Sequence, residues 1–303
     1  MANEKVVVTG GAGFIGSNLV DGLIEKGYEV HVVDTLVSGK KENVNPKAIL
    51  HEKDIRNAVD MAEVMKGAKY VFHLAAVPRV QFSIENPIET HDVNVTGTLN
   101  ILKSAKDAGV KKVVFSASSS AYGDQNIMPL NEVMLAHPMS PYGLHKQIGE
   151  LYCRLFSEIY NLPTVSLRYF NVYGPRLDPA GAYALVIGLF LRLRTEGKPI
   201  TITGDGTQTR DFTHVRDVVR ANILAAESEI VGKGEVINIG AGKNCTINRL
   251  AELMGGEVIH IAPRLEPHDT LADNSLARKL LNWEPMVSFE DGIAELKKLF
   301  NLV

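Results

Sequence analysis

The chain has 303 residues, of which 45% are hydrophobic and 22% are charged, and its formal net charge is -3 at pH 7. This length suffices for one large or two moderate domains with a buried core, and the composition is typical of a globular protein. Because the charge is nearly balanced, we expect no nucleic-acid partner and no attraction to an anionic membrane surface. The longest apolar helical stretch, residues 183–193, is too short to span a bilayer.

The two cysteines, Cys153 and Cys245, lie far apart and lack a metal-ligand spacing. We therefore expect neither a disulfide framework nor a metal site. Residues 1–5 run directly into the first predicted strand, so we expect no signal or transit peptide. These observations favour a reduced, cytoplasmic setting.

Apolar runs of strand length alternate with helical patterns along the first half of the chain. This alternation predicts an α/β fold: a Rossmann-type, doubly wound parallel sheet with helices on both faces. The predicted strands are 5–9, 29–34, 48–52, 70–74, 112–117 and 164–169. The predicted helices between them are 13–26, 57–66, 87–108 and 141–160.

From residue 174 the elements become shorter and richer in proline and glycine. We therefore expect a Rossmann domain over 1–173, rejoined by part of 209–240, and a smaller α/β substrate-binding lobe over 174–303. Helices predicted in this second part are 183–195, 215–228 and 289–300.

The first strand opens directly into Gly10, Gly13 and Gly16, which recur every third residue before a helical pattern. Such spacing suits a tight turn, close approach of a diphosphate and tight packing of helix on strand, with the anion at the helix N-terminus. An ordinary strand-to-helix turn would explain the glycines alone equally well.

Asp34 ends the second predicted strand, 18 residues after Gly16 (34 − 16). A carboxylate there can accept hydrogen bonds from the ribose 2′-hydroxyl of an adenosine and repels a 2′-phosphate, which favours NAD over NADP. Further along, Asp54 follows the third strand. It could cap a helix or contact the adenine.

Tyr142 and Lys146 lie four residues apart at the start of a long predicted helix and so share one face. A tyrosine must lower its pKa by roughly 3 units, about 4 kcal/mol, to act as a base near neutrality. A nearby ammonium and a cationic nicotinamide could supply much of that shift. The pair alone would mean little, but it follows a strand that ends in serines 116 and 118–120.

Together these blocks resemble the extended short-chain dehydrogenase/reductases of the NAD-dependent epimerase/dehydratase family, and within it the enzymes that epimerise UDP-hexoses at C4. The matching segments extend over nearly the whole chain. They are 9–16, 71–76, 94–98, 118–123, 140–146, 167–175, 204–215, Arg264 and 271–273.

The resemblance implies a role for individual residues. Ser118 corresponds to the serine or threonine that binds the reacting sugar hydroxyl, Tyr142 to the base, and Lys146 to the residue that binds the nicotinamide ribose and lowers the pKa of the tyrosine. The implied NAD-binding residues are Gly10, Gly13, Phe14, Ile15, Gly16, Asp34, Ser38, Gly39, Asp54, Ile55, Leu74, Ala75, Ala76, Asn94, Ser116, Tyr142, Lys146 and Tyr169. The implied substrate-binding residues are Ser118, Ser119, Tyr142, Asn171, Val186, Thr203, Arg210, Arg264 and Thr270.

The resemblance also implies the reaction: UDP-galactose and UDP-glucose interconvert through a 4-keto intermediate, with hydride held by bound NAD. In relatives the residue at position 270 gates the sugar 2-substituent, and the small Thr270 implies that the N-acetylated pair is accepted too. Relatives also imply a homodimer formed by helices 87–108 and 141–160.

Some positions depart from the family pattern. Gly188 replaces a frequent proline, and Thr203 stands where many relatives place an aromatic that stacks on uracil. Ser119 and Ser120 occupy the places where a 4,6-dehydratase needs an Asp-Glu pair, which argues against water elimination.

Other readings of the sequence remain open. Arg79 could serve a UDP-glucuronate 4-epimerase or decarboxylase by binding the sugar carboxylate, although an exposed loop arginine is the simpler explanation. Arg210 could form only a local ion pair with Asp211. A non-catalytic NAD(H)-binding sensor would have the same fold, but it would have no use for Ser118, Tyr142 and Lys146.

Overall fold

The computed structural model describes residues 3–179, 186–263 and 268–302. Its centre is a seven-stranded sheet in which every neighbouring pair of strands is parallel. The strand order is β11-β6-β5-β4-β1-β2-β3. The bounds are β1 Lys5–Thr9, β2 Glu29–Asp34, β3 Ile49–Glu52, β4 Tyr70–His73, β5 Lys112–Ser118, β6 Thr164–Tyr169 and β11 Lys233–Ile239.

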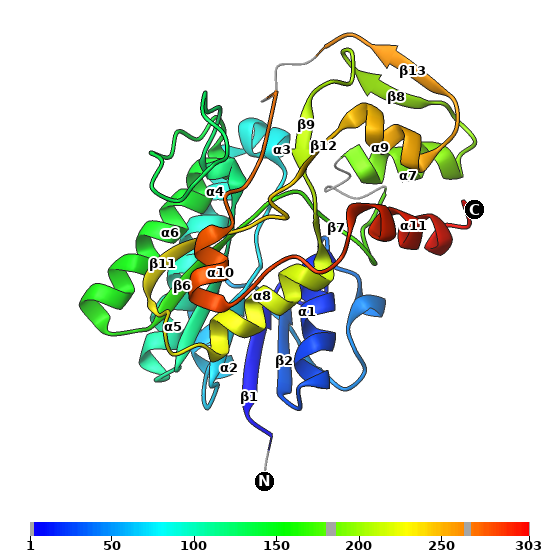
Figure 1. Cartoon of the computed structure of the whole chain (residues 1–303). Helices are drawn as coiled ribbons and strands as arrows, with labels where there is room; N and C mark the ends of the chain where they lie inside the picture. The colour runs from blue at the N-terminus through cyan, green and yellow to red at the C-terminus, as the bar shows by residue number, and fades with distance from the viewer. Residues whose placement is uncertain (1–2, 180–185, 264–267, 303) are drawn as a thin grey trace.

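Helices cover both faces of the sheet, because successive side chains of a strand point to opposite faces. Val6 and Val8 of β1 join a core with α1 (Phe14–Glu25), α8 (Val215–Glu227) and α10 (Ser275–Leu281). Val7 joins the opposite core, which contains α2 (Ala58–Val64), α5 (Gly97–Asp107) and α6 (Pro141–Tyr160). Figure 1 shows α1 and α8 side by side on one face and α5 and α6 on the other.

A smaller lobe with its own apolar core lies beyond the carboxyl ends of the central strands (Figure 1). Three two-stranded pairings organise it: β7 with β10, β9 with β12 and β8 with β13. Its elements are β7 Val172–Tyr173, α7 Val186–Thr195, β8 Ile200–Thr203, β9 Thr209–Asp211, β10 Thr213–His214, β12 Asn244–Thr246, α9 Ile247–Met254, β13 Val258–Ile261 and α11 Phe289–Leu299.

The predicted α/β class and parallel sheet are confirmed, and several elements have the predicted bounds. Other predictions of elements were incomplete. The edge strand β11 was not identified as a strand, and the helix predicted over 87–108 is divided into α4 (Pro87–His91), a π-helical turn over 92–96 and α5. The first residues of the helix predicted over 183–195 lie outside the described residues, and α7 begins at Val186.

A short helix, α3 (Val80–Glu85), was also not predicted, nor were α9 and α10. Within the three described ranges, no helix is long and apolar enough to cross a membrane. In the same ranges, no cluster of three or more His, Cys, Asp or Glu is placed to hold a metal ion.

Candidate active site

The turn between β1 and α1 has the shape that a diphosphate requires. Gly10 has φ +73°, and a Cβ there would come 2.8 Å from the backbone nitrogen of Ala75. A Cβ on Gly16 would collide with the carbonyl oxygen of Gly10, while Gly13 caps α1 without a side-chain hydrogen bond. The turn therefore lets an anionic diphosphate of the cofactor come close to the backbone at the N-terminus of α1. The predicted residues Phe14, Ile15, Leu74, Ala75 and Ala76 lie at this same end of the sheet.

Asp34 ends β2 next to this turn, with its carboxylate held by backbone groups. Its Oδ2 accepts the N–H of Ala12 at 3.0 Å, and its Oδ1 accepts the N–H of Leu36 at 2.9 Å. A Cβ on Gly39 would come 2.8 Å from Oδ1, so only glycine fits against the carboxylate. Ser38 precedes Gly39 in the same loop. The residues present fit an adenosine ribose at the end of β2.

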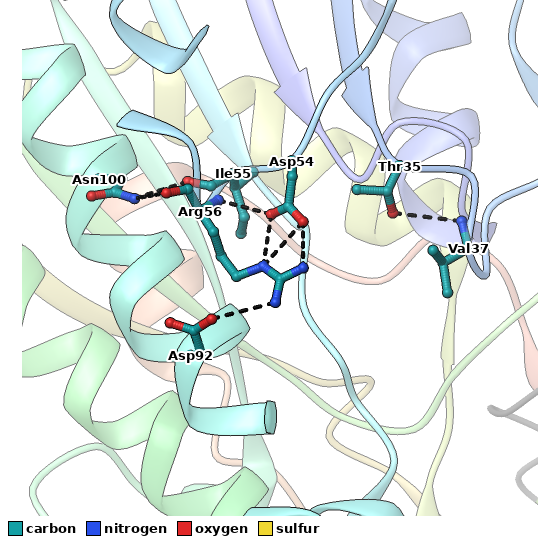
Figure 2. Close-up of polar contacts among 7 residues, drawn as sticks. All are labelled: Thr35, Val37, Asp54, Ile55, Arg56, Asp92 and Asn100. Atoms are coloured by element: carbon teal, nitrogen blue, oxygen red, sulfur yellow. Dashed lines mark hydrogen bonds and ion pairs between the residues drawn. The ribbon is translucent and has the colours of Figure 1, made fainter. Parts of the chain in front are cut away.

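Asp54 and Ile55 lie in a loop that is held in place by hydrogen bonds of Arg56 (Figure 2). Arg56 binds the carboxylate of Asp54 through its Nε and Nη2 atoms, the latter at 2.6 Å, and its Nη1 reaches Asp92 at 3.3 Å. Asn100 donates to the carbonyl oxygens of Ile55 and Arg56 at 3.2 and 2.8 Å. The hydrogen bonds and charge of Arg56 lower the pKa of Asp54. Together with the bonds of Asn100 they fix the loop predicted to meet the adenine.

A buried histidine connects the glycine turn to the helices across the sheet. His73 Nδ1 lies 2.7 Å from Thr9 Oγ1, and Nε2 lies 2.9 Å from Thr98 Oγ1. Thr98 gives its single hydroxyl proton to the carbonyl of Asn94, so Nε2 must carry the histidine proton. Thr9 Oγ1 in turn accepts the N–H of Ala75. Burial lowers the pKa of His73 to about 3, and the ring is neutral.

Three residues predicted to line the cofactor are buried, with polar groups already bonded inside the protein. Asn94, in the π-helical turn, binds the backbone N–H and carbonyl of Val77 through its side-chain amide. Ser116 gives its carbonyl oxygen to Lys146. Tyr169 donates to Asn222 at 2.9 Å. The side chains of Asn94 and Tyr169 can therefore form walls of a pocket rather than offer free polar atoms to a ligand.

Ser118, Tyr142 and Lys146 come together where β5 ends and α6 begins. Lys146 donates to the carbonyl oxygen of Ser116 at 2.6 Å, and its Nζ lies 5.9 Å from the centre of the Tyr142 ring. Ser118 lies near enough to Tyr142 to lower the pKa of the phenol, while its own Oγ donates to Ser120 Oγ at 3.1 Å. Two elements far apart in the sequence thus place a hydroxyl, a phenol and an ammonium in one group.

Glycines allow α6 to lie this close to β5. A Cβ on Gly143 would come 2.5 Å from the carbonyl oxygen of Ser120, and one on Gly149 would collide with the Phe115 ring. Lys146 Nζ lies 5.0 Å from the centre of that same ring. Ser119, predicted to contact substrate, begins the 3-10 turn that follows Ser118.

The acid-base groups have shifted pKa values. Burial raises the pKa of Tyr142 to about 12, and the nearby Ser118 opposes that rise. Burial lowers the pKa of Lys146 to about 8, while Glu150 and Cys153 act in the opposite direction. Within the protein alone, the pKa of Tyr142 therefore moves away from neutrality. The expected lowering depends on the additional positive charge of a nicotinamide.

Part of the predicted substrate-binding set also converges. Asn171 Nδ2 lies 3.4 Å from Thr270 Oγ1, and it donates to the backbone carbonyl of Asp211 at 2.9 Å. Arg210 Nη1 donates to the carbonyl oxygens of Thr209 and His268, which lays its guanidinium along the segment that carries Thr270.

Of the remaining predicted substrate residues, two are placed by the structure and one is not described. Thr203 ends β8 and is half-buried, and Val186 is the first residue of α7. Arg264 lies outside the described residues.

Three residues of this site were not identified from the sequence. Ser83 of α3 accepts the backbone N–H of Tyr142 at 3.1 Å, and His73 and Asp211 tie neighbouring segments together. The only signal for His73 and Asp211 was that they lie in segments 71–76 and 204–215, which resemble the family, and this signal does not indicate their contacts. Ser83 gave none, because α3 itself was not predicted.

Comparison with known proteins identifies the family. The model of the NAD dependent epimerase/dehydratase family matches residues 6–240. A putative UDP-glucose 4-epimerase of Methanocaldococcus jannaschii is 41% identical, over 95% of each chain, and a UDP-glucuronate 4-epimerase of Thermodesulfobacterium geofontis is 38% identical, over 95% of this chain and 93% of the other.

Solved structures agree with this result. A UDP-glucose 4-epimerase of Thermotoga maritima with UDP-glucose has a TM-score of 0.93 at 41% identity, covering 98% of this chain and 99% of that one. A UDP-N-acetylglucosamine 4-epimerase of Methanobrevibacter ruminantium M1, in complex with UDP-N-acetylmuramic acid, has a TM-score of 0.93 at 38% identity, covering all of both chains. The chain therefore belongs to the NAD-dependent epimerase/dehydratase family.

Proposed function

We propose that the protein is a nucleotide-sugar 4-epimerase that interconverts UDP-galactose and UDP-glucose, and the corresponding N-acetylated pair, with resident NAD. The observation that carries this proposal is the group formed by Ser118, Tyr142 and Lys146 at the carboxyl end of β5, on the sheet edge that also holds the glycine turn. UDP-sugar 4-epimerases among the similar proteins support the same assignment.

In this mechanism the chain moves a proton and holds the sugar. The Tyr142 hydroxyl oxygen takes the proton of the sugar C4 hydroxyl, and Ser118 orients that hydroxyl through its own Oγ. Lys146, fixed by the carbonyl of Ser116, provides the positive charge that favours the phenolate. The chemistry that bound NAD supplies is reversible hydride acceptance at C4, which leaves a 4-keto sugar. Tyr142 then returns the proton after the sugar has presented its other face.

Asn171, Arg210 and Arg264 are the proposed diphosphate-binding residues. Such binding tethers the keto sugar while it turns, and arginine suits it because its planar fork of donors matches phosphate oxygens. Of these, Asn171 and Arg210 lie along the segment that carries Thr270. Together with Ser119, Val186 and Thr203 they form the proposed pocket for the sugar nucleotide.

Thr270 supports acceptance of N-acetylated sugars. Its side chain is small, and its hydroxyl is directed toward Asn171 and the N–H of Asp211. A small residue there leaves room for the sugar 2-substituent that a bulky aromatic residue would exclude. The similar UDP-N-acetylglucosamine 4-epimerase is consistent with that substrate range.

A second candidate is a UDP-glucuronate 4-epimerase, which the similar protein of Thermodesulfobacterium geofontis favours. Arg79 would be the recruited cation in that case, and in the structure it is the exposed residue that precedes α3. UDP-glucuronate decarboxylation and a non-catalytic NAD(H) sensor are weaker candidates. Neither has a residue in the described part of the chain that favours it over epimerisation.

The test is conversion of UDP-galactose to UDP-glucose by the purified holoenzyme, without added oxidant or reductant, followed by NMR. A panel containing the N-acetylated pair and UDP-glucuronate measures specificity in the same assay. Tyr142→Phe should reduce the rate by about 10²- to 10⁴-fold, the usual contribution of a general base. Bound NAD with no conversion of any UDP-sugar would instead support the sensor.

We further propose that the enzyme is a cytoplasmic homodimer. Both cysteines are free, and Cys153 is buried. An exposed apolar surface on α6, described below, supports the dimer.

A further inference from the structure

Asp211, at the end of β9, is a fully buried carboxylate surrounded by backbone N–H groups. Its Oδ1 accepts the N–H of Ala241 at 2.8 Å, and its Oδ2 accepts those of Gly242 and Ala272 at 3.0 Å each. Within the described ranges, the hydrogen-bond donors to this carboxylate are backbone N–H groups rather than lysine or arginine side chains. A buried charge without a cation is costly, so these three bonds must compensate for lost hydration.

The backbone of Asp211 forms two further bonds within the proposed substrate pocket. Its N–H donates to Thr270 Oγ1 at 3.3 Å, and its carbonyl oxygen accepts Asn171 Nδ2 at 2.9 Å. Asn171 has φ +28°, an unusual value for a residue other than glycine, so its position requires such support. Arg210, a proposed diphosphate ligand, is the adjacent residue.

The three segments that meet at Asp211 are distant in the sequence. They are the end of β6 with Asn171, the turn after β11 with Ala241 and Gly242, and the extended segment from Thr270 to Ala272. A Cβ on Gly240 would come 3.0 Å from Oδ2, so the turn after β11 lies directly against the carboxylate.

We propose that Asp211 is a positioning residue: its buried carboxylate fixes the segment that carries Thr270, and thereby the pocket that holds the UDP-sugar. This rests on the proposed function. The carboxylate itself need not touch the substrate. Its contribution should appear in substrate binding rather than in proton transfer, because Ser118, Tyr142 and Lys146 belong to other elements.

The test is Asp211→Asn, which keeps the side-chain shape but leaves only one acceptor oxygen. Whichever way the amide is turned, its NH₂ group faces at least one N–H donor. We expect KM for UDP-galactose to rise about tenfold, the effect of losing roughly one hydrogen bond to a charged group. We expect kcat to change less than about threefold, and NAD content to remain that of the wild type.

Asp217 offers a matched control. It is also buried, and its carboxylate accepts the backbone N–H groups of Met286 and Val287 at 3.0 and 3.1 Å, away from the proposed pocket. Unlike Asp211, it also pairs with Arg220 Nη2 at 3.3 Å. Asp217→Asn should reduce stability in a similar way while KM stays unchanged. If both variants raise KM equally, or if Asp211→Asn leaves KM unchanged, the positioning role is wrong.

A second variant and a substrate-independent measurement complete the test. Thr270→Val removes the acceptor for the Asp211 N–H, and it should raise KM even if Asp211→Asn does not fold.

Calorimetry with UDP alone separates the two proposals. A wild type that binds UDP but converts no UDP-hexose contradicts the proposed function, and weaker UDP binding in Asp211→Asn alone would still support positioning. A wild type that neither binds UDP nor converts sugars contradicts both.

Discussion

At the scale of single residues, Tyr142 is a phenol whose ionisation the protein alone opposes. Lowering a pKa from about 12 to neutrality corresponds to about 5 units, or roughly 7 kcal/mol. Lys146 can contribute only while it carries its proton, and its pKa of about 8 leaves it mostly charged at pH 7. In the proposed mechanism, positive charge assembled around Tyr142 would activate it as the base, and Tyr142 would stay protonated until cofactor and sugar are bound.

His73 gives a prediction for stability in acid. Its pKa is about 3 in the folded protein and ordinarily about 6.5, so between these values the unfolded chain binds more protons. Stability should therefore rise with pH across this window, and His73 should contribute a slope of up to about 1.4 kcal/mol per pH unit. His73→Gln, although less stable, should show a flatter dependence in urea unfolding between pH 4.5 and 6.5.

The control for this prediction is His137→Gln, which changes an exposed histidine and should leave the slope as in the wild type. An unchanged slope in His73→Gln would mean that the buried ring takes up a proton as readily as the unfolded one.

Thr270 gives a prediction for specificity. Thr270→Tyr would place a bulky ring beside Asn171 and should lose UDP-N-acetylgalactosamine before UDP-galactose. Because one side chain in a pocket discriminates by roughly 10- to 200-fold, we expect a change in the kcat/KM ratio within that range. Rejection of N-acetylated sugars by the wild type would contradict the assignment of Thr270 as the gate.

At the scale of elements, the site depends on how closely α6 lies on β5. Gly149 faces the Phe115 ring, and Lys146 lies one turn earlier on the same helix face. Alanine is a better helix former than glycine by about 1 kcal/mol, but overpacking a core costs about 1–3 kcal/mol. We expect the packing cost to exceed the gain in helix propensity, because the added Cβ meets the Phe115 ring, which the surrounding core holds in place.

Gly149→Ala should therefore lower stability by up to about 2 kcal/mol and reduce kcat, since it displaces Lys146 and Tyr142 from β5. Thermal unfolding and initial rates measure the two effects. Glu158→Ala, on an exposed position of the same helix, should change neither. Increased stability in Gly149→Ala would show that Phe115 moves aside without cost.

The sequence predicts the elements whose residues repeat with a clear period. Strands 5–9, 29–34 and 164–169 and the helix 141–160 have the predicted bounds, since each is a run of apolar residues or begins with a capping Ser-Pro pair. β11 was missed because its apolar residues are interrupted by Gly234, Glu235 and Asn238. Its identity depends on pairing with β6, which sequence-local patterns cannot reveal.

In the candidate site, too, some residues could be predicted from local sequence patterns and others could not. The sequence could predict that Tyr142, Lys146 and Ser118 lie together, because motif spacing and strand position put them at one sheet edge. Their catalytic roles were implied by the family resemblance and stay predictions. Asp211 and Ser83 act through backbone N–H groups of segments distant in the chain, and no local pattern encodes such contacts.

At the scale of the whole molecule, α6 presents an exposed apolar surface opposite the site. Leu144, Leu151, Leu155 and Ile159 are between 39% and 61% exposed and lie along one side of the helix. Ile84 and Ile88 extend this surface over α3 and α4, which pack beside α6. A hollow of about 580 Å³ opens beside the start of α6 and is lined by Pro87, Ile88, His91, Pro138, Ser140, Pro141, Leu144 and His145.

This surface gives a prediction for assembly. A second copy would cover it, and we expect a mass of about 66 kDa (2 × 33.1 kDa) in analytical ultracentrifugation. The double substitution Leu151→Glu, Leu155→Glu should reduce the mass to that of one chain, because buried charges without partners are costly. Lys298→Glu, exposed on α11, should not. A wild type that sediments as a single chain would contradict the dimer.

The position of β11 at the edge of the sheet also has a consequence for synthesis. When a growing chain has emerged as far as Tyr169, the buried strand β6 has no partner on its outer side until Lys233 appears, 64 residues later (233 − 169). At about 5–20 residues per second this interval lasts roughly 3–13 s. During this interval, the unpaired backbone edge of β6 is open to pairing with another chain. Ribosome-stalled chains in which residue 170 has just left the exit tunnel should therefore aggregate or recruit chaperones more readily than chains in which residue 240 has also emerged.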